Sequence, residues 1–147
     1  MPDKPLILLV EDDPNDALLA KCALERAGVT SPITHLSDGE EAVNYLAGYP
    51  PFHDRAKHPL PSLILLDLKM PKLTGFEVLN WLQSRPELAK IPVVILTGSM
   101  LSEDREQARQ FGVVGFEVKP VEFEQMVAIA QNIKVRFPSP SGPPMPD

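Results

Sequence analysis

The feature that most constrains the fold is a series of short, mostly apolar runs, each followed by a polar residue. The runs occupy residues 6–10, 63–66, 93–96 and 113–118. Apolar runs of this length, bounded by turn residues, are typical of strands buried on both faces, as in a parallel sheet. The carboxyl ends of parallel strands share one edge, where open α/β folds bind ligands. We therefore expect the polar residues that follow the runs to meet in space.

Segments with helical spacing separate the strands and carry helix start and stop residues. Asp13 is expected as the N-cap of the first helix, with Pro14 at its first position and Gly28 after its end. Five strands alternating with five helices predict an α/β domain with a doubly wound parallel sheet. Short right-handed connections favour the flavodoxin-like strand order 2-1-3-4-5. The last helix is predicted at 121–137, which gives a domain over 1–137 and a disordered, proline-rich tail over 138–147.

Length and composition exclude several classes of protein. A chain of 147 residues predicts one domain, and a net charge of −6 without a basic stripe argues against nucleic acid as a direct partner. We see no signal peptide and no apolar stretch of the roughly 20 residues that would span a membrane. The single cysteine, Cys22, allows no internal disulfide and suits a reducing compartment. We therefore expect a cytoplasmic protein with a half-buried Cys22 and no membrane partner.

The residues after the strands suggest metal-dependent phosphoryl chemistry. Glu11 and Asp12 follow the first run and Asp67 follows the third predicted strand, so three carboxylates should meet. Carboxylate oxygens are hard ligands that suit Mg²⁺ or Mn²⁺. A carboxylate beside such an ion can attack phosphorus and form an aspartyl-phosphate. Lys119 could pair with the phosphoryl oxygens, and the Thr97 hydroxyl could donate to them.

The motifs at these positions resemble the receiver domain of two-component response regulators over residues 5 to about 135. They are Glu11-Asp12, Asp67-Leu-Lys-Met-Pro71 with Gly75, Thr97-Gly98 and Lys119-Pro120. The resemblance implies a single-domain response regulator, a phosphoacceptor protein rather than an enzyme. It would act in a phosphorelay in which a histidine kinase supplies the phosphoryl group.

The resemblance also implies a role for each site residue. Asp67 would accept the phosphoryl group. Asp12 would bind Mg²⁺ directly and Glu11 through water, and Lys69 would offer its backbone carbonyl to the metal. Thr97 and Lys119 would sense the phosphoryl group. Phe116 would be the aromatic switch, and because it lacks a tyrosine hydroxyl, we expect packing alone to set its preferred position.

A loop over residues 48–61 departs from the common receiver pattern, because it adds about ten residues before the third strand. This extension looks like that of the stand-alone receivers that serve phytochrome-type photoreceptor kinases. A kinase of that type is therefore the expected partner. His53 and His58 could be metal ligands, but we favour a solvated loop.

Proteins of this family commonly form homodimers through the fourth helix, the fifth strand and the fifth helix, and we expect the same here. Charged residues of the predicted fourth helix could pair across that interface. They are Glu103, Asp104, Arg105, Glu106 and Arg109. Exposed ion pairs contribute only about 0–1 kcal/mol each, so apolar contacts would have to supply the affinity.

Three other functions would use the same fold or the same aspartyl-phosphate chemistry. A haloacid-dehalogenase-type phosphatase needs an acid two residues after the nucleophile, where this chain has Lys69. A flavodoxin-like electron carrier would bind FMN phosphate beside the first strand, where Glu11, Asp12 and Asp13 would repel it. A phosphorylation-independent interaction module on the same fold stays open.

Overall fold

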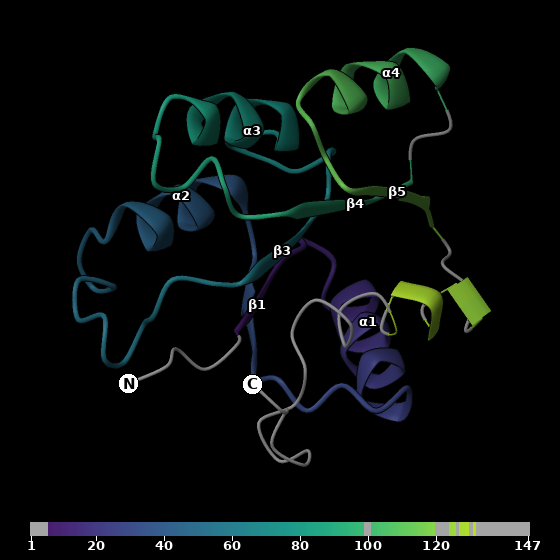
Figure 1. The fold of residues 1–147 in the computed structure, drawn as a ribbon, viewed down its shortest axis with the longest axis horizontal. Helices are drawn as coiled ribbons and strands as arrows, with labels where there is room; N and C mark the ends of the chain where they lie inside the picture. The colour runs from purple at the N-terminus through teal and green to yellow at the C-terminus, as the bar shows by residue number, and fades with distance from the viewer. Residues whose placement is uncertain (1–5, 99–100, 120–123, 126, 130, 132–147) are drawn as a thin grey trace, which may run out of the picture.

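The computed structural model describes residues 6–98, 101–119, 124–125, 127–129 and 131. Five parallel strands form one sheet in the order β2-β1-β3-β4-β5, which confirms the predicted topology (Figure 1). The strands are β1 (Ile7–Val10), β2 (Ile33–Leu36), β3 (Leu63–Leu66), β4 (Val93–Thr97) and β5 (Gly115–Val118).

Helices connect each strand to the next, and the first of them begins at Pro14 after the Asp13 cap, as predicted. They are α1 (Pro14–Arg26), α2 (Gly39–Ala47), α3 (Gly75–Gln83) and α4 (Ser102–Gln110). The fifth predicted helix, 121–137, lies largely outside the described residues, although its described residues at 124–125, 127–129 and 131 are helical. The predicted domain end and the tail over 138–147 also lie outside them. Within the described part of the chain, no helix is long and apolar enough to cross a membrane.

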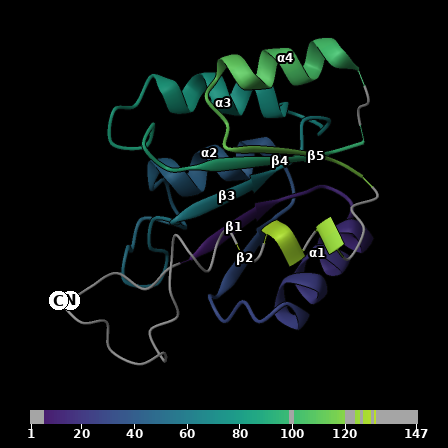
Figure 2. The same cartoon turned by 45° about the vertical axis from the view of Figure 1, so that its right-hand side comes forward.

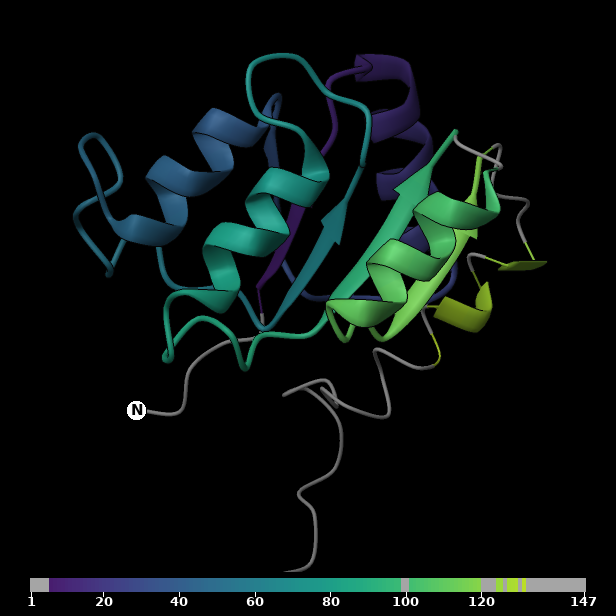
Figure 3. The ribbon, with the colours of Figure 1, turned by 90° about the horizontal axis from the view of Figure 1, so that it is seen from above.

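Helices cover both faces of the sheet, as the short apolar strands require. Helices α2, α3 and α4 lie side by side over one face (Figure 3), and α1 lies against the other (Figure 2). Successive strand residues alternate between the two cores. Leu8 and Ile64 pack toward α2–α4, whereas Leu9 and Leu65 pack toward α1, together with Ile129.

Small residues bring α1 close to the sheet. Ala17 and Ala20 are buried beneath it, whereas the larger Leu18 and Leu19 are 59% and 68% exposed. Cys22 is also exposed, so the expectation that it would be half-buried is wrong. Apolar character alone did not identify the inward face, because alanine side chains are what a close helix-to-sheet contact leaves room for.

Two glycines allow the β3–α3 loop to pack closely against its neighbours. A Cβ on Gly75, the first residue of α3, would collide with the backbone of Asp67 and Leu68. A Cβ on Gly39, the first residue of α2, would collide with the carbonyl of Leu73. The loop that follows Asp67 is therefore packed backbone to backbone at both places.

The long loop over residues 48–61 is fastened by one guanidinium group. Arg55 donates hydrogen bonds to the carbonyl oxygens of Tyr45 (2.9 Å) and Leu46 (2.9 Å) at the end of α2, and to that of His58 (3.1 Å). The Tyr45 hydroxyl donates to the carbonyl of Pro59 (2.7 Å). The loop thus supplies hydrogen-bond donors to carbonyl groups in the last turn of α2.

Candidate functional site

Strand register brings the predicted site residues to one edge of the sheet. Val10 pairs with Leu66, and the amide of Asp67 donates to the carbonyl of Val10 (3.1 Å), so Glu11 and Asp67 leave neighbouring strands at the same level. On the other side of β3, the amide of Lys119 donates to the carbonyl of Thr97 (2.6 Å). All five strands end here because they are parallel.

Three carboxylates converge at this edge. One ligand oxygen from each of Glu11, Asp12 and Asp67 lies within 4.8 Å of the others. Glu11 and Asp67 are buried, and Asp12 is exposed at the mouth of the site. A set of hard oxygen donors, with two ionisable acids held side by side away from water, fits a divalent cation such as Mg²⁺ or Mn²⁺.

Lys119 lies among the acids and holds them with its ammonium group. Its Nζ atom is 2.7 Å from Glu11 Oε1, 2.9 Å from Asp16 Oδ2 and 3.3 Å from Asp67 Oδ2. The three contacts use all three N–H donors of the ammonium. The structure thereby brings Lys119 into the site as predicted, and adds Asp16, which the sequence analysis did not include.

Burial shifts the pKa values of both ends of this network. Loss of water, together with the charge of Asp67, raises the pKa of Glu11 to about 7, although hydrogen bonds from Lys119 and the Asp13 amide act in the opposite direction. Burial by itself would lower the pKa of Lys119, but hydrogen bonds to Glu11 and Asp16 and the charge of Asp67 outweigh it and raise that pKa. Lys119 therefore stays charged, and Glu11 titrates near neutral pH.

The remaining residues predicted for the site also lie at this edge. Thr97 is the last residue of β4 and is fully buried. The Lys69 amide donates to Asp67 Oδ1 (3.2 Å), which orients the carboxyl group. Asp13 lies beside the site but caps α1, since its side chain accepts from the amides of Asn15 (2.8 Å) and Asp16 (3.2 Å). The N-cap prediction for Asp13 is confirmed.

Phe116 has a partner besides its packing neighbours. Its ring lies on β5 and packs against the core beneath α2–α4. The Arg105 guanidinium carbon lies 5.6 Å from the ring centroid, within the range of a cation–π contact. The expectation that packing alone would set the position of Phe116 is therefore corrected, because a charge on α4 contributes.

Helix α4 is also tied to the loop after β3. Lys69 Nζ lies 3.4 Å from Asp104 Oδ2, and Asp104 is only 9% exposed. Arg109 pairs with Glu106 within the helix, at 3.0 Å. Asp104, Glu106 and Arg109 thus have partners within the chain. In particular, Asp104 is buried and already pairs with Lys69 of the same chain.

The histidines divide into three environments. The His58 ring packs edge-on against Tyr45 and Phe52, with centroid distances of 5.9 and 5.3 Å, so the solvated-loop expectation is wrong for this residue. His53 is exposed. His35 on β2 donates from Nε2 to the carbonyl oxygen of Glu11 (2.8 Å) and supports the backbone at the acidic edge.

Asp16 and His35 are the site residues that sequence reasoning missed. Asp16 carried one usable signal, since it lies in the first turn of the helix that directly follows Glu11 and Asp12. His35 carried one too, since it lies in the second strand beside β1. Neither signal identifies the partner, because each contact depends on the spacing between elements distant in sequence.

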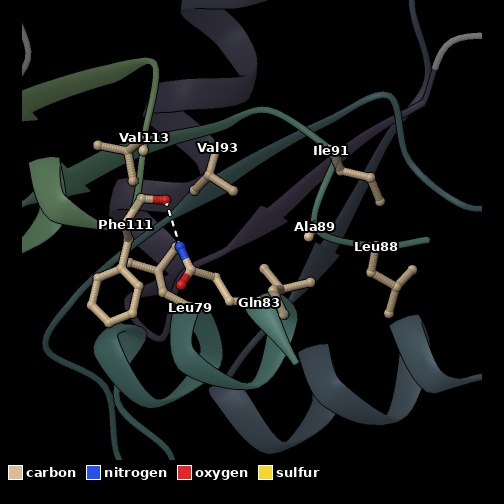
Figure 4. Close-up of a pocket in the computed structure, with 10 residues that line it drawn as sticks. Leu79, Gln83, Leu88, Ala89, Ile91, Val93, Phe111 and Val113 are labelled. Atoms are coloured by element: carbon tan, nitrogen blue, oxygen red, sulfur yellow. Dashed lines mark hydrogen bonds between the residues drawn. The ribbon is translucent and has the colours of Figure 1, made fainter. Parts of the chain in front are cut away.

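A small pocket lies at the opposite edge of the sheet, where β4 begins (Figure 4). It is lined mainly by apolar side chains from the end of α3, the α3–β4 connection and the α4–β5 connection. Its volume is about 40 Å³, and the Gln83 amide donates to the carbonyl of Phe111 (2.9 Å) across it. A space of this size holds a water molecule rather than a ligand, so the acidic edge is the candidate site.

Comparison with known proteins agrees with this geometry. Residues 7–131 match the model of the response regulator receiver domain. The chain is 39% identical over 132 residues to the probable methanogenesis regulatory protein FilR2 of Methanothrix harundinacea, covering 90% of this chain and 83% of that protein. It is 33% identical over 129 residues to the response regulator Rcp1 of Synechocystis, covering 88% and 86%.

Solved structures of response regulators are similar over nearly the whole chain. The bacteriophytochrome response regulator RtBRR is 39% identical with a TM-score of 0.82, covering 97% of this chain and 85% of that one. The phosphorylated cyanobacterial phytochrome response regulator RcpA is 32% identical with a TM-score of 0.78, covering 97% and 100%. The Mn²⁺-bound form of Rcp1 is 30% identical with a TM-score of 0.77, covering 96% and 99%. On its sequence, fold and relatives, this chain belongs to the response regulator receiver domain family.

Proposed function

We propose that the protein is a phosphorylation-dependent response regulator whose Asp67 accepts a phosphoryl group from the phosphohistidine of a histidine kinase. The observation that carries this proposal is the buried Asp67 carboxyl, held beside Glu11 and contacted by the Lys119 ammonium at 3.3 Å. An Asp67 oxygen attacks phosphorus, a P–O bond forms as the P–N bond of the phosphohistidine breaks, and the imidazole leaves. The relative RcpA, solved in a phosphorylated form, supports this chemistry.

Each site residue has a defined part in the proposed transfer. Glu11, Asp12, Asp67 and the backbone carbonyl of Lys69 would hold Mg²⁺ or Mn²⁺. When bound, the ion supplies positive charge that screens the incoming anion and stabilises charge during transfer. Lys119 would pair with a phosphoryl oxygen, and Thr97 would donate its hydroxyl to another.

The test is a titration with beryllofluoride, a phosphoryl mimic, in the presence of Mg²⁺. We expect the wild-type protein to bind it and to unfold at a higher temperature when loaded. Asp67→Asn should abolish both effects, with Asp54→Asn in the distant 48–61 loop as the control for loss of one carboxylate. Equal binding by Asp67→Asn would contradict the assignment. Normal partner binding by that variant would instead favour the phosphorylation-independent module.

The same proposal extends to the partners. The similarity to RtBRR and RcpA supports a phytochrome-type histidine kinase as the phosphodonor. Transfer of labelled phosphate from such a kinase to the wild-type protein, and not to Asp67→Asn, is the expected result. Phosphorylation would then change the surface formed by α4, β5 and the following helix, through which we propose that two copies associate.

A further inference from the structure

The resting position of Lys119 depends on a carboxylate that has no part in the proposed transfer. Of its three partners, Asp67 is the proposed acceptor and Glu11 a proposed metal ligand. Asp16 is neither, yet its Oδ2 atom lies 2.9 Å from Lys119 Nζ, closer than the 3.3 Å of Asp67. The Asp16 side chain is 36% exposed and extends from the first turn of α1.

We infer that Asp16 is a positioning residue that holds the Lys119 ammonium in the unphosphorylated protein and so lowers the affinity of the site for a phosphoryl group. The inference rests on the proposed phosphorylation of Asp67. All three ammonium donors are occupied at rest, so a phosphoryl oxygen gains a donor only as a resting contact is given up. Asp16 competes directly for that donor.

The negative charge of Asp16 also lowers the affinity of the site for a phosphoryl group. Asp16 adds a negative charge to an edge that already carries Glu11, Asp12 and Asp67, and the incoming phosphoryl group is itself an anion. Solvent reduces the repulsion between Asp16 and the phosphoryl group because Asp16 is partly exposed, but solvent does not remove it. Loss of the Asp16 charge should therefore favour the loaded state through both effects.

The test compares beryllofluoride affinity, with saturating Mg²⁺, in the wild-type protein and Asp16→Asn. Asparagine keeps the shape of the side chain and removes its charge. We expect the variant to bind about tenfold more tightly. We also expect slower loss of the phosphoryl group after acetyl phosphate treatment. Asp16→Glu, which restores the carboxylate, should return both values toward wild type. A merely structural role predicts a loss of affinity, not a gain.

Asp13→Asn is the matched control, because it removes one charge from the same end of α1 and keeps an N-cap residue. The Asp13 side chain accepts from the amides of Asn15 and Asp16, whereas the described Lys119 contacts are with Glu11, Asp16 and Asp67. The affinity of Asp13→Asn should stay near that of the wild type. Unchanged or weaker binding by Asp16→Asn, or equal tightening by Asp13→Asn, would overturn the inference while leaving the proposed function intact. Failure of the wild-type protein to bind beryllofluoride would instead overturn the proposed function.

Discussion

The Glu11 carboxyl shows how one residue can be stabilising or destabilising according to its charge. It is 3% exposed and shares its surroundings with a second buried acid, Asp67. Its pKa of about 7, raised from an ordinary 4.5 chiefly by loss of water, means that folding favours the protonated form. The contribution of Glu11 to stability is therefore complete below pH 4.5 and is lost as the pH rises to about 7.

This dependence of stability on pH predicts how Glu11→Gln behaves in the absence of metal. At pH 5 the variant and the wild type should have similar free energies of unfolding. At pH 8 the variant should be more stable, by on the order of 3 kcal/mol, because the wild type must bury a charge. Urea denaturation in a chelator measures the difference, and Glu87→Gln, at an exposed glutamate, controls for lost charge. Added Mg²⁺ should reverse the order at pH 8; a pH-independent difference would contradict the shift.

Gly75 is a second residue at which a substitution should change the stability of the protein. Gly75→Ala places a methyl group against the backbone of Asp67 and Leu68, which cannot move without displacing the proposed acceptor. We expect a loss of about 1–3 kcal/mol in stability, as for other overpacked sites, and weaker beryllofluoride binding. Gly98→Ala is the stability control, because a Cβ there meets no atom within 4 Å. Equal stability of the two variants would contradict the close-packing argument.

At the scale of elements, α4 contacts two parts of the proposed switch through neighbouring residues. Asp104 pairs with Lys69 in the loop after β3, and Arg105 lies over the ring of Phe116 on β5. A displacement of either the loop or the ring would therefore change a contact of the first two turns of α4. Such an element has the connections that a two-state switch requires.

The Arg105 contact predicts the behaviour of Phe116. Arg105→Met keeps the length of the side chain and removes the cation, so the present ring position should lose about 0.5–1 kcal/mol, the range for an exposed cation–π contact. Its population relative to the alternative should fall about two- to fivefold. A fluorine label on Phe116, followed by NMR, measures the two populations. Arg109→Met, whose parent residue pairs with Glu106 in the same helix, should leave them unchanged.

Elements were more predictable than the contacts between them. The ranges of β1, β3 and α1 follow from apolar runs, the Asp13 cap and Gly28, which are local signals. The acidic site followed too, because strand order alone brings Glu11 and Asp67 to one edge. Asp16 could not be placed, because its partner Lys119 is 103 residues away. The expectation that His58 would be solvated was wrong for the same reason, since its packing depends on how Arg55 holds the loop against α2.

At the scale of the whole molecule, the proposed phosphorylation at the acidic edge must change a surface that a partner can contact. Among the residues that the structure describes, Leu101 and Val114 on the α4–β5 side are apolar and exposed, at 53% and 40%. Since Asp104, Glu106 and Arg109 have partners within the chain, apolar contact would have to supply the affinity between two copies.

Association through this side leads to a prediction with a matched pair of variants. The beryllofluoride-loaded wild type should sediment as a dimer. Leu101→Glu should remain a monomer at the same concentration, because a carboxylate would have to lose its water at the contact. Leu60→Glu changes a leucine of similar exposure, 40%, on the distant 48–61 loop and should dimerise like the wild type. All three should bind beryllofluoride equally. A dimer of Leu101→Glu, or a monomeric loaded wild type, would contradict association through α4 and β5, while phosphorylation of Asp67 would stand on its own test.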